Sequence, residues 1–282
     1  MHLDPQNIPV AYALAAVFAW GWSDFIGGYA TRRVNAFLFT AAVHTSGMFL
    51  MGSLALYTHA PFPDKAGAAW SLVAGVLGGG ALAIFYRALS MGNMGLTTPV
   101  AAVVGAALPT LFSLRTEGFP GYLPLAGFLL AGIGVWLISR PDQQGGPPAG
   151  LWQAALAGIG FAGFYICVRE AGDASSYWVA ALSRVSALIV TAAVVLVAGH
   201  TRSMDRSSSA LAVVAGILDV SGTLVFVRAS QGGRLDSAVV LSSLYPAITV
   251  LLARIFLKEH FTHWKVAGIV AALLSVVLIA LH

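Results

Sequence analysis

Residues 140–149 read Arg-Pro-Asp-Gln-Gln-Gly-Gly-Pro-Pro-Ala, the longest polar break between apolar stretches in this chain of 282 residues. Charge, glycine and proline in one short segment are typical of a linker between structural units. Five apolar stretches precede this linker and five follow it. The break therefore predicts two five-helix units, at residues 1–141 and 149–282.

Each of the ten apolar stretches is close to the ~20 residues that a helix needs to cross the hydrocarbon core of a membrane. None shows the alternating polarity of β-barrel strands. The stretches cover residues 8–30, 36–58, 66–89, 95–115, 122–139, 150–169, 176–199, 208–230, 235–257 and 263–281. The sequence therefore predicts an all-α integral membrane protein with ten transmembrane helices.

The composition excludes an ordinary soluble enzyme, because 58% of the residues are hydrophobic and 9% are charged, against roughly 45–50% and about 25% in soluble domains. The net charge of +4 comes from 15 Lys and Arg against 11 Asp and Glu, spread singly along the chain. Without a basic cluster on one face, we expect no nucleic-acid partner. A single cysteine, Cys167, excludes a multi-cysteine metal site, and Glu259-His260-x-x-His263 lacks the third ligand of a zinc peptidase. We expect no cofactor and no metal ion.

The two halves share a weak internal repeat at an offset of 141 to 142 residues. Ala13-Leu14-Ala15 then aligns with Ala155-Leu156-Ala157, Gly21-Trp22 with Gly163-Phe164, Arg87-Ala88 with Arg228-Ala229, and Glu117 with Glu259. Because five crossings bring the chain to the opposite side of the membrane, the second repeat should be inverted relative to the first. Inverted repeats recur in secondary transporters, which bind their substrates near the midplane between the two copies.

Several short motifs stand at the ends and centres of these helices. They are Trp20-Gly21, Arg87-Ala88-Leu89 and Glu117 in the first half, and Arg228-Ala229, Leu241-Ser242-Ser243-Leu244-Tyr245-Pro246 and Leu257-Lys258-Glu259 in the second. With them the chain resembles, over nearly its whole length, the ten-helix EamA-type branch of the drug/metabolite transporter superfamily. The resemblance implies an exporter of aromatic or other neutral amino acids. Val104 departs from the pattern, because the family has a proline at this place.

The predicted function is therefore export of small amphiphilic metabolites by alternating access through a central cavity, without catalysis. We expect a small-molecule substrate and a lipid bilayer as partners, a monomer, and a bacterial-type inner membrane. Coupling to a proton and facilitated diffusion both stay open, as does the orientation of the termini. The alternatives are another substrate class (nucleoside, sugar derivative or drug), an enzyme using Arg184, Asp219 and His44, or a receptor with a packed centre.

Arg184 and Asp219 lie inside predicted membrane helices, where charged side chains are costly and mark pathways, relays or substrate contacts. At ~1.5 Å per residue, they lie about 12 Å and 16 Å from the same membrane face. The two can therefore pair. Such a pair is either a static link between helices or a gating or proton-coupling site.

The first predicted helix carries Trp20, Ser23 and Asp24 on one side, because residues three and four positions apart share a helix face. This polar stripe needs water, a partner or a ligand, and we predict that it contacts the substrate. In the alternative, Asp24 pairs with Arg87 or reaches the membrane surface.

His44 lies in the middle of the second predicted helix, either as an interhelical hydrogen-bond donor or as a substrate contact. Trp20, Tyr86, Tyr165 and Tyr245 have apolar rings with a polar group at the edge, which suits the wall of a substrate cavity. The alternative is that these rings only pack within the bundle.

Pro99 and Pro109 are predicted to interrupt the fourth helix, and Pro246 the ninth. A proline in a membrane helix frees a backbone carbonyl, and such groups persist where they line a cavity. We therefore expect the substrate site along these two helices, with Ser242 and Ser243 near it and with Pro99 and Pro246 in gating. The alternative is a kink that only improves packing.

Overall fold

The computed structural model describes residues 7–91, 94–138, 140, 150–199, 204–257 and 262–280, and every regular element in them is helical. The helices are α1 (Ile8–Ala30), α2 (Ala36–Tyr57), α3 (Lys65–Met91), α4 (Met94–Thr116), α5 (Tyr122–Ile138), α6 (Leu151–Glu170), α7 (Ser176–Val197), α8 (Arg206–Gly232), α9 (Leu235–Ser242), α10 (Tyr245–Leu257) and α11 (His263–Ala280). The predicted all-α class is confirmed, and each predicted stretch contains a helix.

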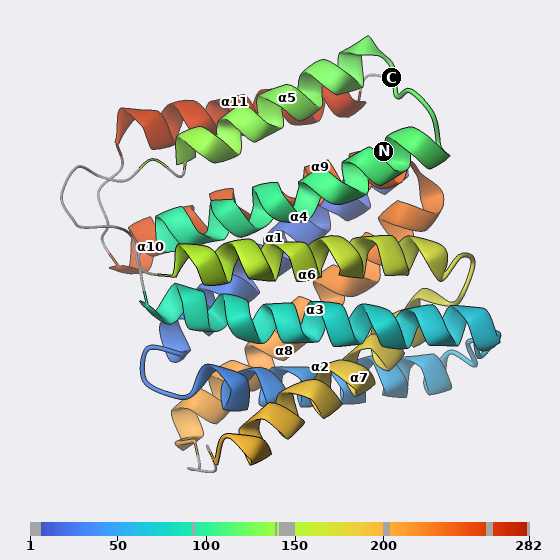
Figure 1. The fold of residues 1–282 in the computed structure, drawn as a ribbon, viewed down its shortest axis with the longest axis vertical. Coiled ribbons are helices and arrows are strands. Elements are labelled where there is room, and N and C mark those ends of the chain that lie inside the picture. The colour runs from blue at the N-terminus through green and yellow to red at the C-terminus, as the bar shows by residue number, and fades with distance from the viewer. Residues whose placement is uncertain are drawn as a thin grey trace.

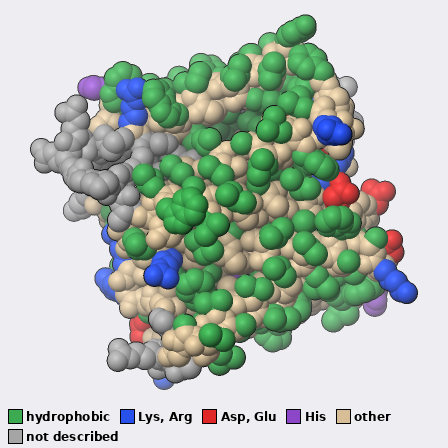
Figure 2. Space-filling model, viewed as in Figure 1, with side chains coloured by type: hydrophobic (Ala, Val, Ile, Leu, Met, Phe, Trp, Pro, Cys, Tyr) green, Lys and Arg blue, Asp and Glu red, His purple; other side chains and the backbone are tan. Residues whose placement is uncertain are grey.

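The helices have the length and composition of membrane spans. Seven segments are long and apolar enough to cross a membrane: α1, α2, α3, α6, α7, α8 and the stretch Leu235–Leu257 made of α9 and α10. Shorter apolar helices lie at Val100–Thr116 and Tyr122–Leu137. Hydrophobic side chains are spread over the face in view, and charged side chains lie mainly toward its two ends (Figure 2), as a lipid-facing surface requires. The chain is a multi-pass membrane protein.

The start of α1 and the end of α11 lie at one end of the bundle (Figure 1), which we call the terminal face. At this face Pro9 packs against Gly233, and the indole Nε1 of Trp178 donates a hydrogen bond to the carbonyl oxygen of Ala60 at 2.9 Å. We call the opposite end the linker face, because Gly150, which follows the linker, lies there. The helices run between the two faces.

The helices pack in pairs that are preserved when the two halves exchange places. α1 packs on α8 as α6 packs on α3, while α2 packs on α7 and α5 on α11. Gly75 of α3 touches the backbone of Ser183 in α7, and Gly216 of α8 touches the backbone of Val43 in α2; a Cβ at either glycine would overlap the facing carbonyl. Because Gly216 follows Gly75 by 141 positions, these contacts occupy equivalent places in the two halves.

The helix predicted at residues 235–257 is broken, and the helix predicted at residues 95–115 is continuous. α9 ends at Ser242 and α10 begins at Tyr245, so that Pro246 occupies the first turn of α10, where its missing N–H costs little. The predicted break at Pro246 is confirmed. The predicted interruption by Pro99 and Pro109 is wrong, because α4 runs unbroken through both. A proline removes a single backbone hydrogen bond, and the rest of this 23-residue helix holds it together.

Candidate functional site

A small cavity lies in the middle of the bundle, between helices of both halves. It is lined by Trp20, Asp24, Gly78, Leu82, Phe161, Phe164, Tyr165, Arg184, Asp219, Thr223 and Tyr245. The space open to the centre of a water molecule is about 50 Å³. One water needs ~10–15 Å³ of such space, so the cavity has room for a few waters.

Arg184 and Asp219 form an ion pair in the wall of this cavity, as their predicted depths allow. Nη2 of Arg184 lies 2.9 Å from Oδ2 of Asp219, and the two side chains are 5% and 9% exposed. The same Nη2 donates to the hydroxyl of Thr223, which itself donates to the carbonyl oxygen of Asp219 at 3.1 Å. Nε of Arg184 has no hydrogen-bond partner among the described residues. The pair offsets the cost of burying either charge alone.

The carboxylate of Asp24 faces the same cavity, and the residue is only 6% exposed. No ion pair or hydrogen bond of its side chain is formed within the described ranges of the chain. Arg87, its predicted alternative partner, lines a separate groove at the linker face. Two carboxylates thus share the cavity with one guanidinium, and Asp24 is the one without an ion-pair partner among the described residues.

An aromatic cluster forms the side of the cavity nearer the terminal face. The ring centroids of Trp20 and Tyr165 are 6.1 Å apart, and Phe226 lies 5.5 Å from Trp20 and 4.8 Å from Tyr165. Nε1 of Trp20 donates to the carbonyl oxygen of Asp219 at 3.1 Å. The hydroxyl of Tyr245 has no hydrogen-bond partner among the described residues. These rings supply apolar area, and Tyr245 offers a free polar group.

Ser23 and Tyr86 lie behind the cavity wall. The hydroxyl of Ser23 donates to the carbonyl oxygen of Ala215 at 2.9 Å and lies 3.0 Å from the hydroxyl of Tyr86. The ring of Tyr86 covers Gly27 so closely that a Cβ there would overlap it. These contacts join α1, α3 and α8. A direct substrate contact by either residue stays a prediction.

His44 is fully buried in α2 and is not part of the cavity lining. Neither ring nitrogen has a hydrogen-bond partner among the described residues. Nε2 points toward Gly79 of α3, 3.2 Å from the place of a Cβ. Nε2 thus faces the backbone of the neighbouring helix, and the role of His44 as an interhelical hydrogen-bond donor or as a substrate contact remains a prediction.

The break between α9 and α10 brings only Tyr245 into the cavity lining. The hydroxyls of Ser242 and Ser243 are buried without a hydrogen-bond partner in the described part of the chain. Pro246 follows Tyr245 at the start of α10. The backbone of Pro99 lies in α4, and its side chain is outside the described part. Roles of these four residues in binding or gating stay predictions.

Several lining residues escape analysis of the sequence alone. Leu82, Phe161, Phe164 and Thr223 look like ordinary residues of apolar helices, although Phe161 stands four positions before Tyr165, a helical spacing that places both on one face. The described residues contain no group of three or more metal-ligating side chains. Glu259, part of the weak metal motif, lies outside the described residues.

Comparison with known proteins relates the second half of the chain to a transporter family. Residues 148–281 match the family described as EamA-like transporters, which nearly coincides with the predicted second repeat. An uncharacterised protein of Methanocaldococcus jannaschii is 35% identical over 77 residues, 27% of this chain and 56% of that protein. The chain thus spans about half the length of this curated relative. A solved crystal structure shares the fold, with a TM-score of 0.78, 18% identity, and coverage of 96% of this chain and 95% of the other.

Proposed function

We propose that the protein is a secondary transporter that exports small amphiphilic metabolites, chiefly neutral and aromatic amino acids, from the cell across a bacterial-type inner membrane. The match of residues 148–281 to EamA-like transporters supports transport. The cavity between the two halves supports alternating access, because inverted-repeat transporters bind substrate there and rock one half against the other. Since one chain encloses the whole cavity, the functional unit in this proposal is a monomer.

The observation that carries the proposal is the pair of charged groups left with free binding capacity in one cavity. An amino acid presents an ammonium group and a carboxylate. The carboxylate of Asp24, which has no partner among the described residues, would accept hydrogen bonds from the ammonium group. The guanidinium of Arg184 would donate a hydrogen bond to the carboxylate through Nε, which has no partner there either, and such a charge-assisted hydrogen bond is stronger than a neutral one.

The aromatic walls supply the other half of the recognition. Trp20, Phe161, Phe164 and Tyr165 line the cavity and would pack against an apolar or aromatic side chain. An amino acid is larger than the few waters for which the cavity has room. The movement that opens the cavity to one face must therefore also widen it, which agrees with alternating access.

A second substrate class, an amine-bearing drug without a carboxylate, is favoured by one specific observation. Arg184 is already paired with Asp219, which leaves Asp24 as the main free charge. An enzymatic function has less support, because His44 does not line the cavity that holds Arg184 and Asp219.

Uptake into proteoliposomes tests the proposal. The purified protein would be given labelled neutral and aromatic amino acids, the matching amines without the carboxylate, nucleosides and sugars, with and without a proton gradient. We expect transport of amino acids, lost in Asp24→Asn and Arg184→Gln and retained in Arg228→Gln, whose side chain lies outside the cavity between Tyr12 and Tyr177. Transport of the amines alone would favour the second class. Transport of none of these compounds would reject the proposal.

A further inference from the structure

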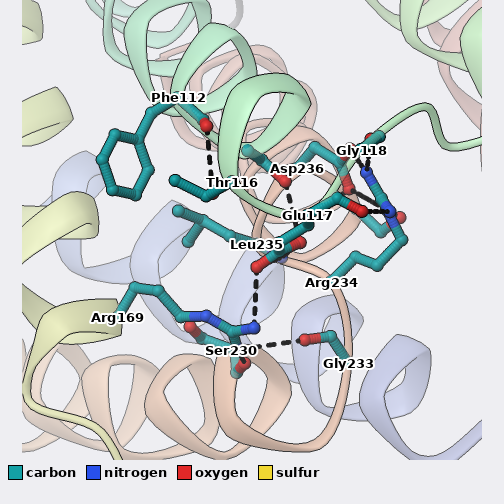
Figure 3. Close-up of polar contacts among 12 residues, drawn as sticks. Phe112, Thr116, Glu117, Gly118, Arg169, Ser230, Gly233, Arg234, Leu235 and Asp236 are labelled. Carbon is teal, nitrogen blue, oxygen red and sulfur yellow. Dashed lines mark hydrogen bonds and ion pairs between the residues drawn. The ribbon is translucent and has the colours of Figure 1, made fainter.

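An ionic cluster at the terminal face joins the first half of the chain to the second. Nη2 of Arg169, near the end of α6, lies 2.7 Å from Oε1 of Glu117, which directly follows α4 (Figure 3). The carboxylate of Glu117 also accepts hydrogen bonds from the hydroxyl of Ser113 at 2.8 Å and from the backbone N–H of Leu235 at 3.1 Å. One carboxylate thus links the C-terminal ends of α4 and α6 to the N-terminal end of α9.

A second ion pair completes this cluster. Arg234 binds Asp236 through Nη2 at 2.8 Å, and its guanidinium also donates to the carbonyl oxygens of Glu117 at 3.1 Å and Gly118 at 2.7 Å. The hydrogen bonds that Arg234 donates to the carboxylate of Asp236 raise the pKa of Arg234, so this charge is fixed. The side chain of Asp236 is fully buried. Four charges sum to zero and are all engaged.

The cluster lies about one helical turn closer to the terminal face than the aromatic side of the cavity. Arg169 follows the lining residue Tyr165 by four positions, which is about 6 Å toward the terminal face. Its guanidinium donates to the carbonyl oxygen of Ser230, which follows Phe226 by four positions. The contact between Arg169 and Ser230 thus lies one helical turn nearer the terminal face than the ring contact between Tyr165 and Phe226 at 4.8 Å. The terminal side of the cavity is closed by an aromatic layer and then by an ionic layer.

The repeat reproduces only part of this cluster on the linker side: Glu117 corresponds to Glu259, which lies outside the described residues, whereas Arg169 and Asp236 have no charged counterpart. At offsets of 142 and 141 residues, Arg169 corresponds to Gly27 and Gly28. Gly27 is covered by the ring of Tyr86. Asp236 corresponds at the first offset to Met94, which is buried. No guanidinium can come from the position equivalent to Arg169, so the two faces are closed by different chemistry at these places.

We propose that Glu117, Arg169, Arg234 and Asp236 form an ionic latch that keeps the cavity closed to the terminal face and sets its resting orientation toward the linker face. Opening to the terminal face separates α4 and α6 and so breaks the pair between Glu117 and Arg169. Opening to the linker face leaves this pair intact. The inference builds on the proposed alternating access and adds the direction in which the empty protein prefers to open.

Accessibility of a cysteine in the cavity tests the latch without any substrate. The native thiol is removed by Cys167→Ala, and Leu82→Cys places a reporter on the cavity wall. A membrane-impermeant thiol reagent is then applied to vesicles of either orientation. In a second variant, which lacks the cavity reporter, Asp173→Cys in an exposed loop of the terminal face shows which vesicles present that face to the reagent. Labelling of the cavity reporter from each side measures how often the cavity opens to that side.

Glu117→Gln keeps the shape of the side chain and removes its charge. We expect the labelling rate from the terminal face to rise about threefold or more, as loss of roughly 0.7 kcal/mol or more of ion-pair stabilisation implies, with less labelling from the linker face. Asp64→Asn is the matched control, because Asp64 is an acidic residue of the same face that only caps α3 through the N–H of Gly67. Unchanged labelling in Glu117→Gln, or an equal rise in Asp64→Asn, would overturn the latch.

Salt provides a test that does not depend on whether the variant folds. The pair between Arg169 and Glu117 is partly accessible, with side chains 32% and 15% exposed, so ~1 M salt should screen it. We expect salt to raise terminal-face labelling when the latch residues are intact and to change little in Glu117→Gln. Absence of a salt effect on the intact latch contradicts the proposal. Because labelling needs no substrate, failure of the latch and failure of the transport assay are distinguishable.

Discussion

Arg184 and Asp219, which are 35 positions apart in the sequence, form an ion pair of 2.9 Å inside the membrane-spanning bundle. The two partners are not equivalent, because a carboxylate can take up a proton and so lose its charge, whereas a guanidinium cannot lose its own. Removing one partner therefore has different consequences from removing the other.

Asp219→Asn should be the more damaging single change, because it leaves the guanidinium of Arg184 buried without its counter-ion. We expect a loss of about 3 kcal/mol or more in the free energy of unfolding, measured by reversible unfolding in mixed detergent micelles. Arg184→Gln should cost less, since Asp219 can bind a proton. The double variant Arg184→Met with Asp219→Leu should return to within about 1 kcal/mol of the original protein. Equal losses in both single variants would contradict this explanation.

Two buried tyrosine hydroxyls should respond differently to removal. Tyr86→Phe removes the contact with Ser23 at 3.0 Å and should lower the free energy of unfolding by about 1 kcal/mol. Tyr245→Phe removes a hydroxyl with no hydrogen-bond partner among the described residues. It should leave stability nearly unchanged and weaken substrate binding if that hydroxyl contacts the substrate. The same unfolding assay and a binding titration check both variants.

Gly27→Ala should destabilise the protein by about 1–3 kcal/mol, because the added Cβ overlaps the ring of Tyr86 and a packed core tolerates added volume poorly. Gly52→Ala is the matched control in a helix, since its Cβ would meet no atom within 4 Å. We expect the control to be neutral or stabilising by up to about 1 kcal/mol. Adding Tyr86→Leu to Gly27→Ala should recover part of the loss, and absence of recovery would argue against this overlap.

Proton coupling can be assigned to Asp24 or Asp219 by substitution. If Asp219 carries the coupled proton, Asp219→Asn should abolish accumulation of substrate against a gradient and leave equilibrating exchange intact, because exchange needs no net proton movement. If Asp24 carries it, Asp24→Asn should abolish both activities, because Asp24 also binds the ammonium group in the proposed site. Counterflow and gradient-driven uptake in the same proteoliposomes measure the two activities. Gradient-driven uptake at the original rate in both variants would show that neither residue is the coupling site.

The helices could be predicted from the sequence because apolar length is a local property. The stretch at 8–30 is α1, and the stretch at 235–257 contains the break that Pro246 predicts. The fourth helix shows where this reasoning fails. Whether a proline breaks a helix depends on how strongly the remaining turns are held by their neighbours, and these contacts are not visible in the sequence.

The cavity could be predicted only in part. Asp24, Arg184 and Asp219 line it, because the cost of burying a charge restricts where such a side chain can point. Ser23 and Tyr86 instead bind each other behind the wall. Their environment depends on how the helices are rotated against one another, which is set by close contacts such as those of the glycines in α3 and α8.

The terminal-face cluster could not be found from the sequence, because its partners lie far apart in the chain. Glu117 stands at a helix end, where a charged residue is expected to meet water. Arg234 is separated from it by 117 positions. Phe161, Tyr165 and Arg169 follow one another every four positions, which predicts that two cavity residues and a cation share one helix face. This spacing does not indicate which residue Arg169 binds.

At the predicted repeat offset of 142 residues, Arg169 in the second half corresponds to Gly27 in the first, so that one half has a guanidinium where the other has a residue without a side chain. A carrier built from two identical halves would present its cavity equally to both sides and would have the same half-saturation constant on each. Where only a fraction of the molecules is open to a side, the apparent dissociation constant from that side equals the intrinsic constant divided by that fraction. The proposed latch would thus make the half-saturation constant for substrate higher at the terminal face, although neither residue lines the cavity.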